Sequence, residues 1–258
     1  MNKIAVIAAM EREVAPLVRG PDWEVSQILP APYRSYESEH AIVVCSGIGA
    51  ASACQTAVEV AALNPLTIIS AGFAGGITSQ WHVGDVMFPA RIVRSEGGAS
   101  VDLSCWPEMN GFCRKGVLVS STGIPGQDAK RLLANLYRAD AVDMEAATVA
   151  EVADGNGIPF VAVKVICDEY NFPMPDLEPF LGPEGKFLIG RFLLHTALRP
   201  RLWSVLRQLA SNSKRASQEL CRVLQSLLVP GALNLAQGSG LHTLGALPND
   251  LEAGTVSR

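Results

Sequence analysis

Acidic residues stand at the ends of predicted strands in three parts of this sequence. Glu13 follows the first apolar run, Asp143 and Glu145 precede a predicted helix, and Asp168 ends the apolar run 160–167. Burial of a carboxyl group at a strand end favours its protonated form and raises its pKa, which suits the group to proton transfer. These residues are therefore candidates for acid–base chemistry, although the charged run around Glu13 by itself also fits a solvated helix N-terminus.

Glycine-rich turns follow two other apolar runs. The stretch Ser46–Gly49 (SGIG) precedes a helix of small residues, so its backbone donors could face an anion, a hydroxyl or a water. The stretch Ala74–Gly76 (AGG) lets a flat ligand approach the backbone closely. A dinucleotide-binding Rossmann protein is a competing interpretation, but Ser52 stands where the GxGxxG fingerprint needs its third glycine.

Short apolar runs alternate with helical stretches through most of the chain. The runs predicted as strands are 4–9, 41–45, 67–71, 83–90, 116–120 and 160–167. The predicted helices are 50–64, 127–137 and 145–157, followed after an irregular loop by 186–198 and 201–228. Apolar runs without alternation suit strands covered on both faces, and the strand–helix alternation predicts a mostly parallel α/β sheet. Ligands of such sheets bind beyond the carboxyl ends of the strands, where the acidic and glycine-rich segments lie.

The composition indicates one globular domain that acts on a small molecule. The chain has 258 residues, of which 48% are hydrophobic, and a formal net charge of -4. Because it has no basic run, nucleic acid is not expected as a ligand. No apolar stretch reaches the roughly 20 residues of a membrane-spanning helix, which leaves only peripheral membrane contact. We expect a cytoplasmic protein with a catalytic domain over 1–228 and a flexible tail over 229–258.

Taken in order, the acidic and glycine-rich segments resemble the purine nucleoside phosphorylase and methylthioadenosine/S-adenosylhomocysteine nucleosidase superfamily, over residues 3 to 170. The matching segments are Ala9-Met10-(x2)-Glu13, Ser46–Gly49, Ala74–Gly76 followed by Val83–Asp85, Val142–Ala146, and the strand ending in Asp168. The resemblance implies a single-domain, three-layer α/β/α fold with a mixed, mostly parallel central sheet. It also implies an enzyme that cleaves the N-glycosidic bond of an adenine nucleoside.

By this resemblance the acidic residues are the reacting groups. Asp168 would protonate or hydrogen-bond N7 of the purine, which turns a poor leaving group into a neutral base. Glu145 would hold the ribose 2′- and 3′-hydroxyls, with Met144 packed beneath the ring and Asp143 on the same wall. Glu13 would activate the attacking water, because hydrolysis needs a base on the face opposite the leaving group.

The resemblance also places other residues at the substrate. Ala74 and Gly75 would present their backbone to the base, and Ser46 and Gly49 would lie near the attacking water or anion. Cys167 stands where the nucleosidases carry a serine beside the catalytic aspartate. This departure is expected to weaken one hydrogen bond while leaving the aspartate in place.

The phosphate-binding residues of the phosphorylases are incomplete in this sequence. Phe73 stands where bacterial phosphorylases carry a serine, and Ser70 where they carry an arginine. Hydrolysis is therefore expected, without a cofactor or metal, since the six cysteines show no CxxC or CxxH spacing. Phosphorolysis with inorganic phosphate as co-substrate stays open, because Arg12, Arg91 or Lys164 could supply a positive charge.

The C-terminal segments 168–173, 190–192 and 197–200 are similar to the hopanoid-associated branch of the superfamily, whose members remove adenine from adenosylhopane. An apolar substrate of hopanoid biosynthesis would suit the long helical extension, although such an apolar stripe also fits core packing. The apolar residues of this extension are Phe192, Leu193, Leu194, Leu198, Leu202 and Trp203. The resemblance further implies a homodimer or a larger homo-oligomer. A non-catalytic nucleoside-binding module is a third alternative, which the intact acidic residues disfavour.

Overall fold

The structure is a computed structural model of this chain. It describes residues 2–30, 32–97, 100–103, 113–174, 178–180, 188, 199, 202–229 and 242–244. The predicted helix 186–198 lies outside these residues except for Leu188, and so does most of the predicted tail 229–258. Within the described ranges, no helix combines the length and the apolar character needed to cross a membrane.

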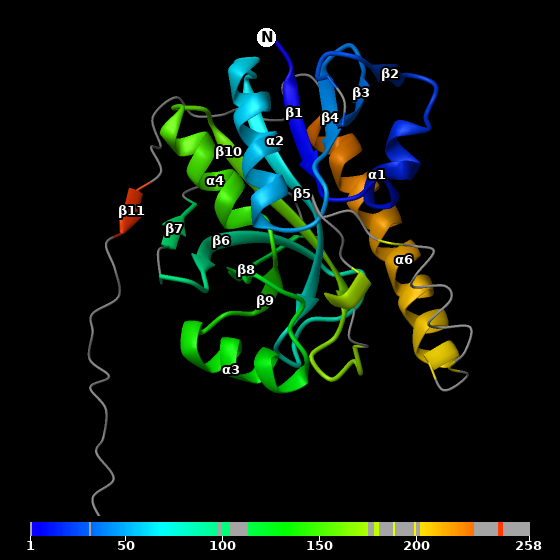
Figure 1. The fold of residues 1–258 in the computed structure, drawn as a ribbon, viewed down its shortest axis with the longest axis vertical. Coiled ribbons are helices and arrows are strands. Elements are labelled where there is room, and N and C mark those ends of the chain that lie inside the picture. Colours follow the sequence, from blue (N-terminus) through cyan, green and yellow to red (C-terminus); the bar gives the residue numbers. More distant parts are fainter. Residues whose placement is uncertain are drawn as a thin grey trace, which may run out of the picture.

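Four parallel strands form the centre of the sheet (Figure 1). They are β1 (Ile4–Ala8), β4 (Ala41–Cys45), β5 (Thr67–Gly76) and β10 (Phe160–Asp168), paired in the order β4-β1-β5-β10. They are almost continuously apolar because helices cover both faces of the sheet. The antiparallel strands β3 (Arg34–Glu37) and β2 (Glu24–Ser26) continue the sheet beyond β4.

The other side of the sheet closes on itself. Strand β6 (Val86–Arg94) pairs in parallel with β8 (Cys113–Ser120), and β8 pairs in parallel with β9 (Ala141–Asp143). Strand β9 then pairs antiparallel with β5, and β6 pairs antiparallel with β10, so these strands make a closed ring of pairings. The short strands β7 (Ser100–Asp102) and β11 (His242–Leu244) extend the edge of β6.

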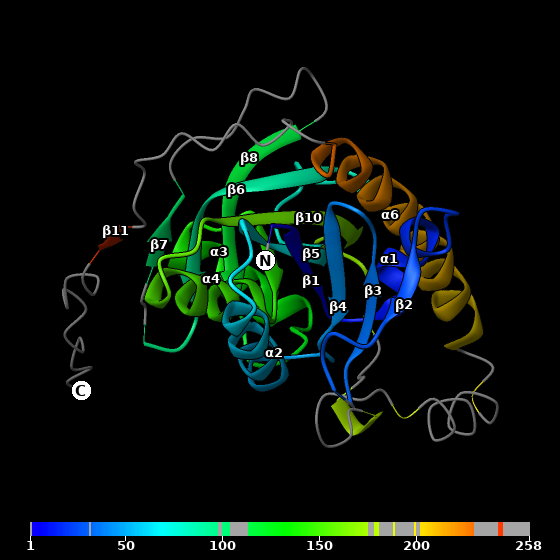
Figure 2. The same cartoon turned by 90° about the horizontal axis from the view of Figure 1, so that it is seen from above.

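Helices cover the two faces of the sheet and give three layers. Helices α1 (Glu11–Val18) and α6 (Trp203–Leu227) pack together on one face, and α2 (Ala50–Ala62) and α4 (Ala146–Gly155) pack together on the other (Figure 2). Successive side chains of a strand point to opposite faces, so Val6 belongs to the core beneath α6 and Ile7 to the core beneath α2. Helix α3 (Gln127–Tyr137) lies at the end of the ring, and a short turn of 3-10 helix, η1, spans Glu178–Phe180. The predicted mixed α/β/α architecture is confirmed.

The predicted elements that fall within the described residues are present, with shifted ends. The run predicted as a strand over 67–71 continues to Gly76, because β10 pairs with β5 along its length and β9 joins at its end. Helix α2 ends earlier than predicted, where Asn64 adopts a left-handed conformation with φ of 51°. The short strands β2, β3, β7, β9 and β11 were not predicted, because runs of three or four residues lack a distinct periodic pattern.

Candidate active site

A cavity of about 270 Å³ lies beyond the carboxyl ends of the central strands, the usual ligand position in a parallel α/β sheet. Strands β5, β9 and β10 supply its floor, the loop after β1 and the start of α1 supply one wall, and the first half of α6 supplies another. Its lining includes eight of the ten predicted site residues, namely Glu13, Ala74, Gly75, Asp143, Met144, Glu145, Cys167 and Asp168.

Asp168 is the last residue of β10 and is held by a buried cation. Its side chain forms an ion pair with the Lys130 ammonium group, which α3 brings to the same end of the cavity. The side chains of Lys130 and Asp168 are only 2% and 5% exposed. The ammonium group also donates to the carbonyl oxygens of Glu169, at 3.0 Å, and Gly76, at 3.3 Å. Each ammonium proton thus has an acceptor, and the group is fixed in place.

Cys167 supports the same carboxyl group. Its thiol donates a hydrogen bond to Oδ1 of Asp168, with an S to O distance of 3.2 Å. Burial and the neighbouring Asp168 carboxyl raise the pKa of the thiol well above its ordinary value, so it stays protonated and acts as a donor. The expected hydrogen bond at this position is therefore formed, with sulfur in place of oxygen.

Gly75 leaves the space that this arrangement requires. A Cβ atom at this position would lie 3.1 Å from Oδ2 of Asp168 and 3.3 Å from Nζ of Lys130. Both neighbours are buried and hydrogen-bonded, so neither can move aside freely. Gly75 and Ala74 line the cavity from within β5, where backbone atoms can contact a flat base.

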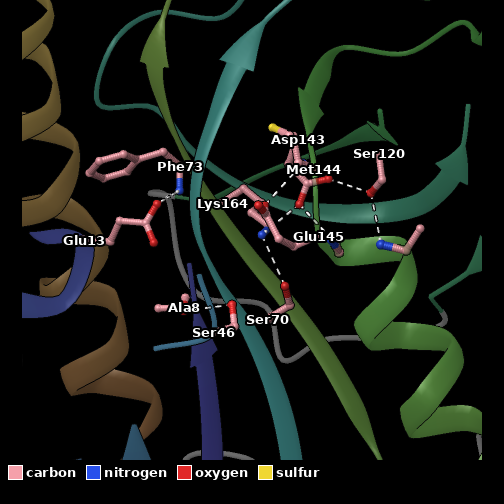
Figure 3. Close-up of polar contacts among 12 residues, drawn as sticks. Ala8, Glu13, Ser46, Ser70, Phe73, Ser120, Asp143, Met144, Glu145 and Lys164 are labelled. Carbon is pink, nitrogen blue, oxygen red and sulfur yellow. Dashed lines mark hydrogen bonds and ion pairs between the residues drawn. The ribbon is translucent and has the colours of Figure 1, made fainter. Parts of the chain in front are cut away.

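Glu13 lies in the first turn of α1, at a different wall of the cavity from Asp168. Its carboxylate accepts a hydrogen bond from the backbone N–H group of Met10 at 3.0 Å. It also accepts one from the backbone N–H group of Phe73 at 3.4 Å (Figure 3). Burial raises the pKa of Glu13, while the bond from Met10 and the charge of Lys164 act in the opposite direction. A carboxylate with a raised pKa and fixed orientation is suited to accepting a proton from water.

Glu145 is held by the glycine-rich loop. The backbone N–H of Gly49 donates to Oε1 of Glu145 at 2.7 Å, and the N–H of Met144 donates to Oε2 at 3.3 Å. Gly49 has a φ of 95°, a left-handed conformation that favours glycine and turns its N–H toward the carboxylate. Burial, followed by the charge of Asp143, raises the pKa of Glu145 to about 7. The sequence left an anion, a hydroxyl or a water open as the partner of the loop donors, and in the structure the Gly49 donor binds a carboxylate of the chain itself.

Asp143 lines the cavity, but its carboxylate is committed to a buried network (Figure 3). It pairs with Lys164 at 2.9 Å and accepts hydrogen bonds from Ser120, at 2.6 Å, and from the backbone N–H of Ala146, at 2.9 Å. Lys164 also donates to Ser70 at 3.2 Å. Burial alone would lower the pKa of Lys164, but the nearby carboxylates, Asp143 first, raise it. Asp143 and Lys164 therefore balance each other's charge next to Glu145.

Two predicted site residues, Ser46 and Gly49, make hydrogen bonds within the protein. The Ser46 hydroxyl donates to the carbonyl oxygens of Gly47, at 2.8 Å, and Ala8, at 3.3 Å. Ser46 and Gly49 do not belong to the described lining of the cavity. Among the basic residues considered for phosphate, Arg12 lines the cavity, whereas Arg91 is engaged with Asp102 and Ser100.

The sequence analysis missed Lys130 and the particular α6 residues that line the cavity. A basic residue in the first turn of a helix opposes the helix dipole, and this was the one local signal for Lys130. The α6 residues that line the cavity recur at helical spacing and are Leu206, Leu209, Ala210 and Ser213. Of the apolar residues proposed for the substrate, Leu202 and Trp203 lie in the described part of the chain, and the α6 residues that line the cavity begin one turn later, at Leu206. In the described part of the chain, no cluster of His, Cys, Asp or Glu is arranged to hold a metal ion.

Both a family model and individual proteins are similar to this chain in sequence. A family model described as the phosphorylase superfamily matches residues 3–115 and 109–181. The chain is 26% identical to a 5′-methylthioadenosine/S-adenosylhomocysteine nucleosidase of Halalkalibacterium halodurans, over 65% of this chain and 86% of that protein. It is 24% identical to an aminodeoxyfutalosine nucleosidase of Helicobacter pylori, over 65% of this chain and 86% of that protein.

Solved structures show the same fold. The 5′-methylthioadenosine nucleosidase of Arabidopsis thaliana in its apo form superposes with a TM-score of 0.66 at 21% identity, covering 89% of this chain and 97% of that chain. The 5′-methylthioadenosine/S-adenosylhomocysteine nucleosidase of Helicobacter pylori with butyl-thio-DADMe-Immucillin-A superposes with a TM-score of 0.65 at 18% identity, covering 88% of this chain and 98% of that chain. These likenesses support the three-layer architecture derived above.

Proposed function

Because this chain belongs to the phosphorylase superfamily, we propose that it hydrolyses the N-glycosidic bond of an adenine nucleoside and releases adenine. The observation that carries the proposal is one cavity lined by the carboxyl groups of Glu13, Glu145 and Asp168, each on a different element and each with its own hydrogen-bond partners. Separate environments allow the three groups to act as base, ribose ligand and acid in one reaction.

In the proposed reaction, one proton is given to the leaving base and another is taken from the attacking water. The Asp168 carboxyl group gives its proton to N7 as the electron pair of the C1′–N9 bond moves to the base, so adenine leaves neutral. Glu13 takes a proton from the attacking water, whose oxygen bonds to C1′. The anionic Glu145 accepts hydrogen bonds from the ribose hydroxyls and stabilises the positive charge that develops on the sugar.

The charges around the cavity favour water over phosphate as the nucleophile. Lys130 and Lys164 already pair with Asp168 and Asp143, so neither positive charge is free for a phosphate. Arg12 is the remaining basic residue in the described lining, and it is exposed at the rim. A phosphate beside Glu13 would also meet a buried carboxyl group, which disfavours a second anion.

The lining contributed by α6 supports an apolar 5′-substituent on the nucleoside. Leu206, Leu209 and Ala210 present apolar side chains to the cavity, and Ile48 and Met174 add to this lining. The relatives described above are nucleosidases of thioether nucleosides and of aminodeoxyfutalosine. The C-terminal resemblance adds a hopanoid group as a candidate for the apolar 5′-substituent.

The test is release of free adenine from 5′-methylthioadenosine, followed by chromatography with and without inorganic phosphate. Adenine plus free sugar in both conditions is the expected result. A sugar 1-phosphate formed only with phosphate would replace hydrolysis by phosphorolysis, and no adenine in either condition would contradict the activity. Asp168→Asn should lower the rate of release by about 10²–10⁴-fold and leave a measurable residual rate, while Asp128→Asn, at an exposed position of α3, serves as the control.

A further inference from the structure

Lys130 is a buried cation, and the hydrolysis proposed above assigns no step to it. Its side chain is 2% exposed, and it reaches the end of β10 from the first turn of α3. Burying an ammonium group is unfavourable, and at the start of a helix the dipole adds to the penalty. Replacement of both partners of a buried ion pair by apolar residues of similar size is often tolerated. Folding alone therefore does not require such a pair.

The ammonium group is aimed at one atom of the proposed acid. It bonds Oδ2 of Asp168, while the carbonyl oxygens of Gly76 and Glu169 fix it from other directions. The Cys167 thiol bonds Oδ1 of the same carboxyl group. Asp168 is thereby locked between two donors, and it still lines the cavity.

From this geometry we infer that Lys130 is a positioning residue for the acid, which stabilises the carboxylate that Asp168 becomes when its proton passes to the purine. The inference rests on the proposed function. It assigns to Lys130 no contact with the substrate and no proton transfer of its own, because its three protons are held by Asp168, Gly76 and Glu169.

The proton balance makes the effect specific to the transition state. In the substrate complex of the proposed reaction, Asp168 carries the proton that it gives to N7, so the ion pair of the free protein becomes a hydrogen bond to a neutral carboxyl group. As the C1′–N9 bond breaks, the proton moves to N7, and Asp168 becomes an anion directly beside a fixed cation. The interaction is strongest at the moment of bond breaking, so it increases kcat more than it decreases KM.

The experiment is a double-mutant cycle measured with 5′-methylthioadenosine. Lys130→Met is combined with Asp168→Asn, and kcat and KM are determined for the unaltered protein, both single variants and the double variant. Lys130→Met should lower kcat by about 10²-fold, the usual effect of losing one preorganised charge partner, while KM changes by less than about threefold. In the Asp168→Asn background the same substitution should change kcat by less than about twofold, because residues acting as a unit are not additive.

Two further variants separate this role from a structural one. Lys130→Gln keeps a donor without the charge and is used if Lys130→Met does not retain the native circular dichroism spectrum. Arg131→Met changes the neighbouring residue of α3, which is exposed and pairs with Asp128, and should leave kcat unchanged. If Lys130 has only a structural role, its substitution should lower the thermal stability of the protein. The substitution should then also lower kcat by the same factor in the unaltered protein and in Asp168→Asn.

The outcomes distinguish this inference from the proposed function. An unaltered protein that releases no adenine overturns the proposed function, and this inference with it. An unaltered protein that releases adenine, together with an undiminished kcat in Lys130→Met and Lys130→Gln, overturns this inference alone. An equal loss of kcat in the presence and absence of the Asp168 carboxyl group also overturns it.

Discussion

Acidification should switch off substrate binding through Glu145. Burial and the charge of Asp143 raise the pKa of this residue to about 7, although it accepts hydrogen bonds from the N–H groups of Gly49 and Met144. The proposed reaction needs the anion, which accepts hydrogen bonds from both ribose hydroxyls. Since protonation removes that anion, activity is present above pH 7 and is lost as the pH falls through this value.

The magnitude follows from the titration of a single group. With a pKa of about 7, roughly nine tenths of the molecules carry anionic Glu145 at pH 8 and roughly one tenth at pH 6, so kcat/KM should fall about tenfold between these values. A further fall of about tenfold is expected by pH 5. The assay is the initial rate of adenine release from 5′-methylthioadenosine at low concentration, because kcat/KM reports the free enzyme.

Two variants decide whether the fall of kcat/KM at low pH comes from Glu145. Glu145→Gln should be much less active, and its kcat/KM should no longer fall between pH 8 and pH 6. Glu59→Gln, on the exposed side of α2, should keep the fall of kcat/KM. Circular dichroism at each pH shows whether the protein remains folded. A kcat/KM that is constant from pH 8 to 5.5, or a fall that persists in Glu145→Gln, would refute the reasoning.

Other substitutions test the remaining supports of the cavity. Gly75→Ala should lower kcat about tenfold, because the new Cβ displaces the Asp168 carboxyl group and small misplacements of a reacting group are costly; steady-state kinetics check this. Cys167→Ala should lower kcat about fivefold by removing one hydrogen bond, and Cys167→Ser should restore it, whereas equal rates in both variants would contradict that role. Lys164→Met should reduce the free energy of unfolding by about 3–5 kcal/mol, measured in urea, since it leaves Asp143 buried without its partner; a loss below about 1 kcal/mol would contradict this.

Much of the fold could be predicted because its signals are local. The central strands are apolar runs of five to ten residues, and their helices have the length and end signals expected of helices. Strand β9, which joins β8 to β5, was missed because it is only three residues long. Closure of the ring could not be predicted either, since it depends on strand pairings between distant parts of the chain.

The positions of the acidic residues were predicted for a related reason. Asp168 ends a run of buried residues, and Glu13 follows another at the start of a helix, so each is carried to the carboxyl end of the sheet by its own strand. The proposed roles of these residues came from the order of the motifs along the chain. Their placement around one cavity agrees with those roles, which the experiments above test.

Local patterns were enough to place Glu13 and Asp168 at strand ends, because strand periodicity and helix starts depend on neighbouring residues. Which groups hold the acidic side chains depends on how the elements pack. Lys130 and Asp168 are 38 residues apart, and Gly49 and Glu145 are 96 residues apart. Contacts over such separations exist only after the sheet and its helices have packed, and no local pattern specifies which donor will meet which carboxylate. The charges and hydrogen bonds that tune the site are therefore a property of the packed fold.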